Sequence, residues 1–282
     1  MVKEFTYLRH EVDLLFRRLS KDNTSGSAQI AFNAVKLIKT IIRRADAEAS
    51  ARFFKLISKQ LVSAQPSMGI ILNLAYSIDE MAGTVTRKDI LSYLDNFKTT
   101  IETHTKIIAE RTSALLESSK TVMTYSASST VLESLRHAYK NGLRFSVVVP
   151  ESRPMNEGRG MMVKLSRASI PVLYMTDAAG MSMLASGDID TVLIGGDAIQ
   201  RNDFVCKTGS LAIATLCKTE RVPLFGLCGT EKIIPEQFSK KFIIANKPAK
   251  EVSDFKSRFV QITNRYFEIV PFSMFTKIIT DG

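Results

Sequence analysis

Five short apolar runs in the second half of the chain constrain its fold more than any other feature. They read TVMTY, FSVVV, VLYMT, TVLIG and LFGLC, and they cover residues 121–125, 145–149, 172–176, 191–195 and 224–228. Segments that suit helices, such as SSTVLESLRHAYKNG, lie between them. Because the runs are apolar throughout instead of alternating, they predict parallel strands covered on both faces. This half is therefore expected to form a doubly wound, Rossmann-like α/β domain.

The first half of the chain has a helical period instead. Apolar residues recur at helical spacing over residues 28–42 and 53–61, which predicts an antiparallel helical bundle. The clearest helix begins after Thr86, with Asp89 in its first turn, and its pattern continues to Leu115, a length of about 45 Å. The predicted domains are a helical bundle that ends in this long linker helix and a Rossmann-like domain with the ligand pocket, over residues 1–118 and 119–282.

The net charge of +10 is spread evenly along the chain. No block of Lys and Arg stands out, so direct nucleic-acid binding has little support beyond bulk charge. The longest apolar stretches are shorter than the roughly 20 residues of a membrane span, and the N-terminus contains acids, unlike a signal peptide. Three cysteines in a chain of this length do not suggest a disulfide framework. We therefore expect a cytoplasmic protein without a membrane span.

The turns after the predicted strands carry the candidate binding residues. Ligands of open parallel sheets bind outside the carboxyl ends of the strands, where helix N-termini offer free N–H groups to an anion. With two cations nearby, these turns predict a site for a small phosphorylated ligand, although the same residue types also serve as ordinary turn and cap residues. The candidates are Tyr125, Ser126, Arg153, Asp177, Gly196, Asp197 and Lys207.

The three cysteines do not have the spacing of a metal site. Cys206, Cys217 and Cys228 form no CxxC pair and have no clustered histidines beside them, so we expect neither a metal nor another cofactor. Cys217 and Cys228 are predicted to be small buried residues. Cys206 could instead be exposed and reactive.

Five segments occur in an order and spacing that resembles a known family. They read TVMTYSASSTVLESLRHA, VVPESRP, IPVLYMTDAA, TVLIGGDAI and CKTGSLAIATLCKTERVP. They resemble the alpha/beta/delta subunit family of translation initiation factor 2B, and within it the archaeal-type or alpha-subunit-like members. That family also contains ribose-1,5-bisphosphate isomerase and methylthioribose-1-phosphate isomerase. A weaker match over residues 23–35 places Gly26 in a turn similar to the family's phosphate-contacting turn, without the Arg usual there.

The resemblance implies a mechanism for the isomerase branches, with one residue changed. Asp197 matches their acid or base, whereas Ser126 occupies the position of their catalytic Cys. A thiol with a pKa of about 8.5 exchanges a proton near neutrality, and a serine hydroxyl does so poorly without an activating base. Arg153 and Lys207 match residues that contact the phosphate or sugar, and Cys206 replaces a binding Asn.

Two functions follow from these matches. The favoured one is a noncatalytic regulatory subunit that binds a sugar phosphate or nucleotide and contacts initiation factor 2 or a sister subunit. The alternative is a sugar-phosphate aldose-ketose isomerase with Asp197 as acid or base, so the question of enzymatic activity stays open. A homodimer is also expected, because a lone chain would struggle to cover the apolar closing segment FEIVPFSMFTKII.

Overall fold

The computed structural model describes residue 13 and residues 16–22, 25–44 and 51–282. The chain divides into two compact units, Met1–Glu102 with Glu231–Ile243 and Thr103–Thr230 with Ile244–Gly282. This division falls inside a helix, whereas the sequence places the domain boundary after residue 118. None of the helices in the described ranges combines the length and apolar character that a membrane crossing requires.

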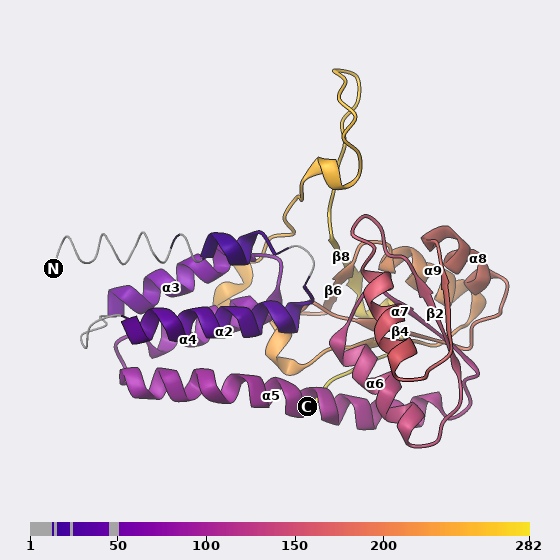
Figure 1. Cartoon of the computed structure of the whole chain (residues 1–282), viewed down its shortest axis with the longest axis horizontal. Helices are drawn as coiled ribbons and strands as arrows, with labels where there is room; N and C mark the ends of the chain where they lie inside the picture. Colours follow the sequence, from indigo (N-terminus) through magenta and orange to yellow (C-terminus); the bar gives the residue numbers. More distant parts are fainter. Residues whose placement is uncertain (1–12, 14–15, 23–24, 45–50) are drawn as a thin grey trace. The chain divides into compact units, whose positions relative to one another are not determined.

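The first unit is helical, as its apolar period predicts. Its helices are α2 (Ser27–Arg44), α3 (Ala51–Ala64), α4 (Gly69–Met81), the first part of α5 (Arg87–Ser113) and the short η3 (Glu236–Lys241) (Figure 1). The start of α5 is a reciprocal cap, since the Thr86 N–H donates to Asp89 Oδ2 (2.9 Å) and the Asp89 N–H donates to Thr86 Oγ1 (3.3 Å). With 27 residues, α5 is about 40 Å long.

The second unit contains the predicted parallel sheet. All of its neighbouring strands run parallel, and their order is β3-β2-β1-β4-β7-β9. The strands are β1 (Thr121–Tyr125), β2 (Ser146–Pro150), β3 (Val172–Met175), β4 (Thr191–Gly195), β7 (Leu224–Leu227) and β9 (Lys277–Ile279). The Rossmann-like fold class is therefore confirmed. The strand order reverses between β1 and β4, and this switch point is where such sheets bind ligands.

Helices connect the strands and bury both faces of the sheet. They are α6 (Ser129–Lys140), α7 (Glu157–Arg167), α8 (Asp177–Ala185) and α9 (Ser210–Glu220). One buried cluster, which includes Met123 and Val192, packs with residues of α8 and α9. The other includes Val122 and Leu193 and packs with residues of α6 and α7. This alternation along β1 and β4 explains why the strands are apolar at every position.

A second, antiparallel sheet was not predicted from the sequence. It consists of β5 (Ala198–Gln200), β6 (Asp203–Lys207) and β8 (Phe267–Pro271). The remaining short 3-10 turns are η1 (Ala114–Leu116), η2 (Thr230–Lys232), η4 (Ala249–Glu251) and η5 (Phe272–Met274).

The closing segment is partly covered by its own chain, and the expectation of a homodimer stays a prediction. Strand β8 pairs with β6, and β9 completes the parallel sheet beside β7. Val270, Phe275 and Ile279 are buried, and the Phe275 ring packs edge-on against Phe204 with centroids 4.9 Å apart. Ile269 on β8 is exposed, so the segment still offers apolar surface there.

Candidate functional site

Two serines at the carboxyl ends of β1 and β2 have strained backbones. Ser126 has a φ of 65° and Ser152 a φ of 64°, in the left-handed region that side chains other than glycine rarely adopt. The Ser126 N–H donates to Ser152 Oγ at 2.8 Å, which links the two turns. Such strain, on the order of 1–3 kcal/mol per residue, is found most often at binding and catalytic sites. Asn156, Ser169, Arg201 and Arg221 also have a positive φ, but the linked pair Ser126 and Ser152 lies at the switch-point end of the sheet, which is therefore the candidate site.

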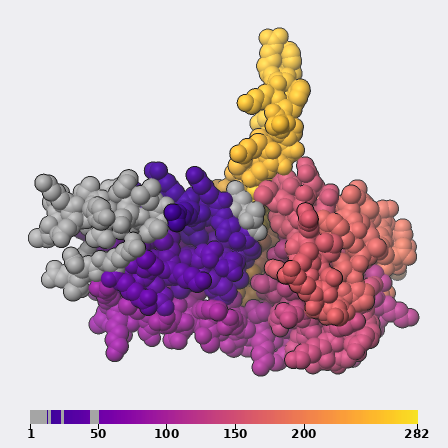
Figure 2. Space-filling model, in the orientation of Figure 1, coloured from indigo at the N-terminus to yellow at the C-terminus, as the bar shows by residue number. Residues whose placement is uncertain are grey.

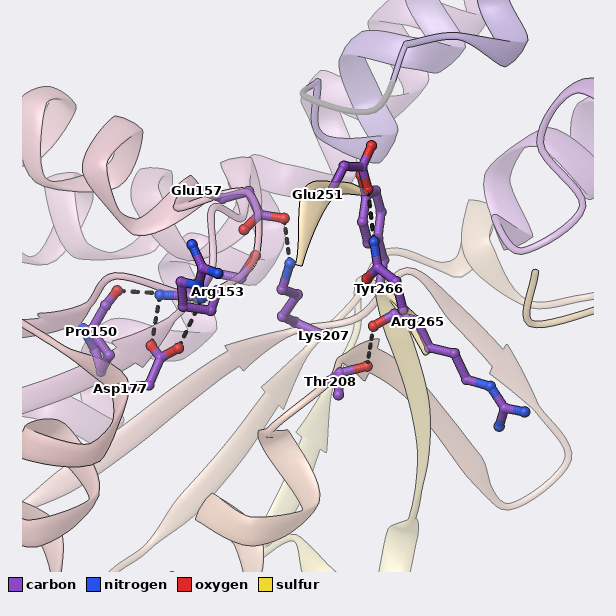
Figure 3. Close-up of polar contacts among 12 residues, drawn as sticks. Pro150, Arg153, Glu157, Asp177, Lys207, Thr208, Glu251, Arg265 and Tyr266 are labelled. Carbon is purple, nitrogen blue, oxygen red and sulfur yellow. Dashed lines mark hydrogen bonds and ion pairs between the residues drawn. The ribbon is translucent and has the colours of Figure 1, made fainter. Parts of the chain in front are cut away.

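Asp177 holds the turn after β2 in place. Its Oδ1 accepts from the Ser152 N–H (2.7 Å), and its Oδ2 accepts from the Arg153 N–H (2.8 Å). Figure 3 shows this carboxylate between the two backbone donors. Both of its oxygens thus have backbone partners, which indicates a positioning role for Asp177 rather than direct ligand contact.

Lys207, the last residue of β6, is buried against Glu157. Its side chain is 4% exposed, and Nζ lies 2.5 Å from Glu157 Oε1 (Figure 3). The ring of Tyr266 lies 5.0 Å from the ammonium group, and the Tyr266 hydroxyl donates to Glu251 Oε2 at 2.6 Å. The second oxygen of Glu157 is buried and has no hydrogen-bond partner within the described part of the chain. Lys207 is therefore paired and covered here, and a ligand reaches it only if Glu157 or Tyr266 moves.

The N-terminus of α9, predicted to receive an anion, already holds one from the chain itself. Glu268 Oε1 accepts from the N–H groups of Gly209 (2.8 Å) and Leu211 (2.7 Å). Gly209 has a φ of 108°, and a Cβ there would lie 2.6 Å from the hydroxyl of Tyr125. Glu268 on β8 thus caps the helix and satisfies donors that a phosphate would otherwise use.

The pKa of Tyr125 reflects its burial and the negative charge at this end of the sheet. Burial raises the pKa of its phenol well above the usual value, and the negative charges of Asp177, Glu157 and Glu268 raise it further. The phenol therefore stays protonated at physiological pH. Three carboxylates thus lie close enough to raise the pKa of this phenol. Their negative charge also repels a phosphate, so the inner part of the site should bind an anion less well than the turn residues alone predict.

A cleft of about 660 Å³ lies outside this inner region, within the second unit. One wall contains Arg153, whose guanidinium Nη2 donates to Val252 O at 3.4 Å. The other walls include Thr208 and Arg265, and Thr208 Oγ1 donates to Arg265 O at 2.8 Å (Figure 3). Pro154 and Ile262 add apolar surface. A ligand that carries both an anionic and an apolar part fits this lining.

The remaining candidates fall in different places. Asp197 follows β4 and is half-buried, and its N–H donates to Val205 O at 2.8 Å. Because Tyr125 pairs with Ile194, the turns that hold Ser126 and Asp197 leave neighbouring strands. Gly196 is buried by packing, since a Cβ there would lie 2.5 Å from the Phe204 ring. Gly26 lies in the first unit, just before α2, and its phosphate contact stays a prediction.

The alternative that Cys206 is exposed and reactive is wrong. Its side chain is buried on β6, and burial raises the pKa of its thiol far above the usual value. Cys217 and Cys228 are buried as predicted, and burial raises the pKa of Cys217 to about 12.

These thiols should be inert in the folded protein. We expect less than one of the three to react with a thiol-specific disulfide reagent at pH 8 within minutes, because burial blocks access and disfavours the thiolate. All three should react after unfolding in guanidinium chloride. Rapid reaction of Cys206 in the native chain would contradict the buried β6 position.

Several residues that shape the site were not among the candidates. Glu157 lies 50 residues from its partner Lys207, and Glu268 lies 59 residues from Gly209. Tyr266 and Glu251 come from the segment between η3 and β8. Glu157 is the first residue of α7, and a carboxylate there is also a routine first-turn residue, so it gave no distinct signal.

Comparisons with known proteins find similar sequences along most of this chain. Residues 23–282 match the Initiation factor 2 subunit family. A ribose 1,5-bisphosphate isomerase of Archaeoglobus fulgidus is 26% identical over 263 residues, which cover 91% of this chain and 83% of the relative.

Solved structures show the same fold at lower identity. The structure of the Pyrococcus horikoshii OT3 translation initiation factor eIF-2B has a TM-score of 0.84 and 24% identity, and the match covers 96% of this chain and 94% of that one. A chain of the tetrameric eIF2B-beta2-delta2 complex from C. thermophilum has a TM-score of 0.75 and 18% identity, with 96% and 91% coverage. The similar proteins thus include both an isomerase and translation factor subunits.

Proposed function

Since this chain belongs to the Initiation factor 2 subunit family, we propose that it is a noncatalytic, regulatory subunit of the initiation factor 2B type. In this proposal it binds a small phosphorylated ligand, a sugar phosphate or a nucleotide, in the second unit. It assembles with a second copy or with a sister subunit, contacts initiation factor 2 and works in the cytoplasm.

The observation that carries this proposal is the serine at position 126. Its hydroxyl stands where the resemblance implies a catalytic thiol, and the three thiols of the chain are buried. A serine needs a base to act in proton transfer. Of the histidines in the described part, His137 bonds Asn141 and His104 pairs with Asp281. Loss of a positioned acid or base lowers a rate by about 10² to 10⁴, which supports binding without efficient turnover.

The contacts of the cleft support a binding role. Arg153 offers a guanidinium that can hold a phosphate with two hydrogen bonds, and its backbone is fixed by Asp177. Lys207 can add a second cation once its ion pair with Glu157 opens. The pocket in this proposal therefore selects ligands that compete with Glu157 for Lys207.

An aldose-ketose isomerase of the ribose-1,5-bisphosphate or methylthioribose-1-phosphate type remains the second candidate. It is favoured by the retained Asp197, Arg153 and Lys207, and by the similarity to the Archaeoglobus fulgidus isomerase over most of this chain. In that case Asp197 would act as the acid or base that transfers the proton. A group other than a thiol would act as the second proton donor or acceptor.

One experiment separates the two functions. The protein is incubated with ribose 1,5-bisphosphate and with methylthioribose 1-phosphate while ketose product and thermal shifts are followed, with nucleoside monophosphates tested for shifts alone. The proposal predicts stabilisation without product in the wild type, and product after Ser126→Cys. Turnover by the wild type that Asp197→Asn abolishes would establish the isomerase instead. If the protein shows no thermal shift and no turnover with any of these ligands, the binding role is contradicted.

A further inference from the structure

The helices α6 and α7 of the second unit share a surface that is rich in basic side chains. They pack against each other over the same face of the parallel sheet (Figure 1). Figure 2, in the same orientation, shows both helices at the molecular surface, in pink and salmon. The exposed cations are Arg136 and Lys140 on α6, Arg144 just after it, and Lys164 and Arg167 on α7. We call these five residues the α6–α7 basic face.

Helical geometry brings these cations together. Arg136 and Lys140 are four residues apart and Lys164 and Arg167 are three apart, so each pair lies on neighbouring turns of one side of its helix. Because α6 and α7 each connect two parallel strands, they run in the same direction, and their last turns lie at the same edge of the sheet. Packed helices have axes about 8–10 Å apart, so the basic face is on the order of 20 Å across.

Few acids offset this positive charge. The acids of α6 and α7 are Glu133 and Glu157. Glu133 pairs with Arg136 at 3.7 Å, whereas Glu157 pairs with the buried Lys207. The other four cations of the basic face have no carboxylate partner among the residues that the structure describes. The face therefore carries a net positive charge that its own helices do not neutralise.

Arg144 is held in place by uncharged groups. Its Nη1 donates to Tyr139 O (3.0 Å) and to Leu143 O (2.8 Å), and its guanidinium lies 4.7 Å from the centre of the Tyr139 ring. These contacts fix the orientation of the guanidinium but leave its charge uncompensated. An anion that binds there therefore finds a preorganised partner, which lowers the entropy cost of binding.

The lining of the basic face fits a nucleic acid better than a protein. Within the described chain, no large apolar side chain of α6 or α7 is exposed. Protein interfaces usually have an apolar core, whereas interfaces with nucleic acids are polar and strongly positive. The aromatic ring of Tyr139 is half-buried, with Arg144 over it and the Phe145 ring edge-on at 5.7 Å. Bases of a single strand would therefore find no free ring to stack on, which favours a double helix.

We propose that the α6–α7 basic face binds the phosphate backbone of an RNA double helix without reading its sequence. The choice of RNA over DNA rests on the proposed function in translation, whereas the binding of a duplex rests on the face alone. The sequence shows no basic block because the five cations come from two separate segments. The ligand cleft is a different site, since its Arg153 follows the carboxyl end of β2 and the basic face lies at the opposite edge.

The number of cations sets the expected strength of this interaction. Each cation that neutralises a phosphate releases condensed counterions, so five cations predict a slope of about −4 for the logarithm of affinity against the logarithm of salt concentration. The dissociation constant should be on the order of 10⁻⁶–10⁻⁴ M at physiological salt, the usual range of binding without sequence specificity. The affinity should therefore fall by about 10²-fold between 50 and 200 mM salt.

The test is fluorescence anisotropy of a labelled RNA duplex of about 20 base pairs, titrated with the full-length chain over a series of salt concentrations. We expect Lys140→Gln/Lys164→Gln to weaken binding at least about 10-fold at low salt and to reduce the slope by about 2. Lys140→Arg/Lys164→Arg, which keeps both charges, should bind like the wild type. Circular dichroism should show that both variants are folded, because the two side chains are exposed.

Lys218→Gln/Lys277→Gln is the matched control, since it removes the same charge from exposed positions of the same unit. Lys218 lies on α9, which covers the other face of the sheet, and Lys277 lies on β9 at the far edge. This variant should bind the duplex within about twofold of the wild type. Equal weakening by the two glutamine variants would mean that bulk charge binds the RNA, and would overturn the proposal.

Three further probes decide between the possible partners. A single-stranded RNA of the same sequence, or a DNA duplex, that binds more tightly than the RNA duplex would overturn the choice of an RNA double helix. Polyglutamate that competes as well as unlabelled duplex would assign the face to an acidic protein instead. Absence of duplex binding at 50 mM salt and about 100 μM protein would overturn the site altogether. None of these results affects the ligand cleft, which the sugar-phosphate assays test separately.

Discussion

Gly158→Ala is expected to destabilise the protein by about 3 kcal/mol or more, the upper end of what overpacking usually costs. A Cβ at position 158 would lie 2.0 Å from the carbonyl oxygen of Pro150 and 3.0 Å from its carbonyl carbon. These are backbone atoms of β2, so the strain can be relieved only by moving α7 away from the sheet. Because Glu157 precedes this glycine, the shift should also disturb its ion pair with Lys207. Urea denaturation would measure the loss as a lower midpoint with an unchanged slope.

Gly160→Ala provides the matched control in the same helix. A Cβ at Gly160 meets nothing within 4 Å, so alanine should only improve helix propensity and raise the stability by about 0.5–1 kcal/mol. If Gly158→Ala lowers the free energy of unfolding and Gly160→Ala raises it, the loss at Gly158 is due to the contact with Pro150. Equal effects of the two substitutions would mean that α7 is not packed against β2 as described.

Much of this fold could be predicted because its determinants are local. The five predicted strands appear as β1, β2, β3, β4 and β7, since each is a continuous apolar run, and the cap of α5 follows from Thr86 and Asp89. The polar turn residues Ser126 and Asp197 lie at neighbouring strand ends because parallel strands carry their carboxyl ends to one edge.

The charge balance of the site could not be predicted, because it depends on residues far apart in the sequence. Glu157 and Glu268 reach Lys207 and Gly209 across 50 and 59 residues, and no periodic pattern encodes such pairs. The ligand contact of Gly196 stays a prediction, and the close approach of the Phe204 ring to this glycine was likewise not predictable from the sequence. The positions of the turns thus follow from the sequence, whereas their electrostatics follow from the tertiary structure.

The antiparallel sheet and the exposed segment of residues 252–261 were missed for a different reason. Strand β5 has three residues and β6 has five, so neither forms an apolar run that a sequence pattern would reveal. Strands this short become stable only when a third strand, β8, pairs with them. The apolar composition near the C-terminus suggested exposure there, yet Val270, Phe275 and Ile279 are buried, and the most exposed phenylalanines are Phe255 and Phe259.

Lys207→Met is expected to destabilise the protein by about 3 kcal/mol at neutral pH. The substitution removes the ammonium group but leaves the Glu157 carboxylate in a mostly buried position without its counter-charge. The second oxygen of Glu157 already lacks a hydrogen-bond partner among the described residues, so no bond on the same group compensates for the loss. Urea denaturation at neutral pH measures the difference.

The double variant Lys207→Met/Glu157→Gln should recover most of this loss, because a neutral amide is far easier to bury than an unpaired carboxylate. A double-mutant cycle would give the coupling between the two side chains. Additive effects of the two substitutions would show that the pair contributes nothing specific.

Glu157→Gln alone tests the function of the pair rather than its stability. The amide oxygen can still accept a hydrogen bond from Lys207 Nζ, so the fold should lose less than it does in Lys207→Met. The ammonium charge, however, is no longer neutralised by a carboxylate, and a phosphate gains a partner without separating an ion pair. We therefore expect ribose 1,5-bisphosphate to stabilise Glu157→Gln more than the wild type, with a several-fold lower dissociation constant in calorimetry. If the ligand stabilises Glu157→Gln no more than the wild type, Lys207 does not bind the phosphate. The ion pair between Glu157 and Lys207 would then only stabilise β6.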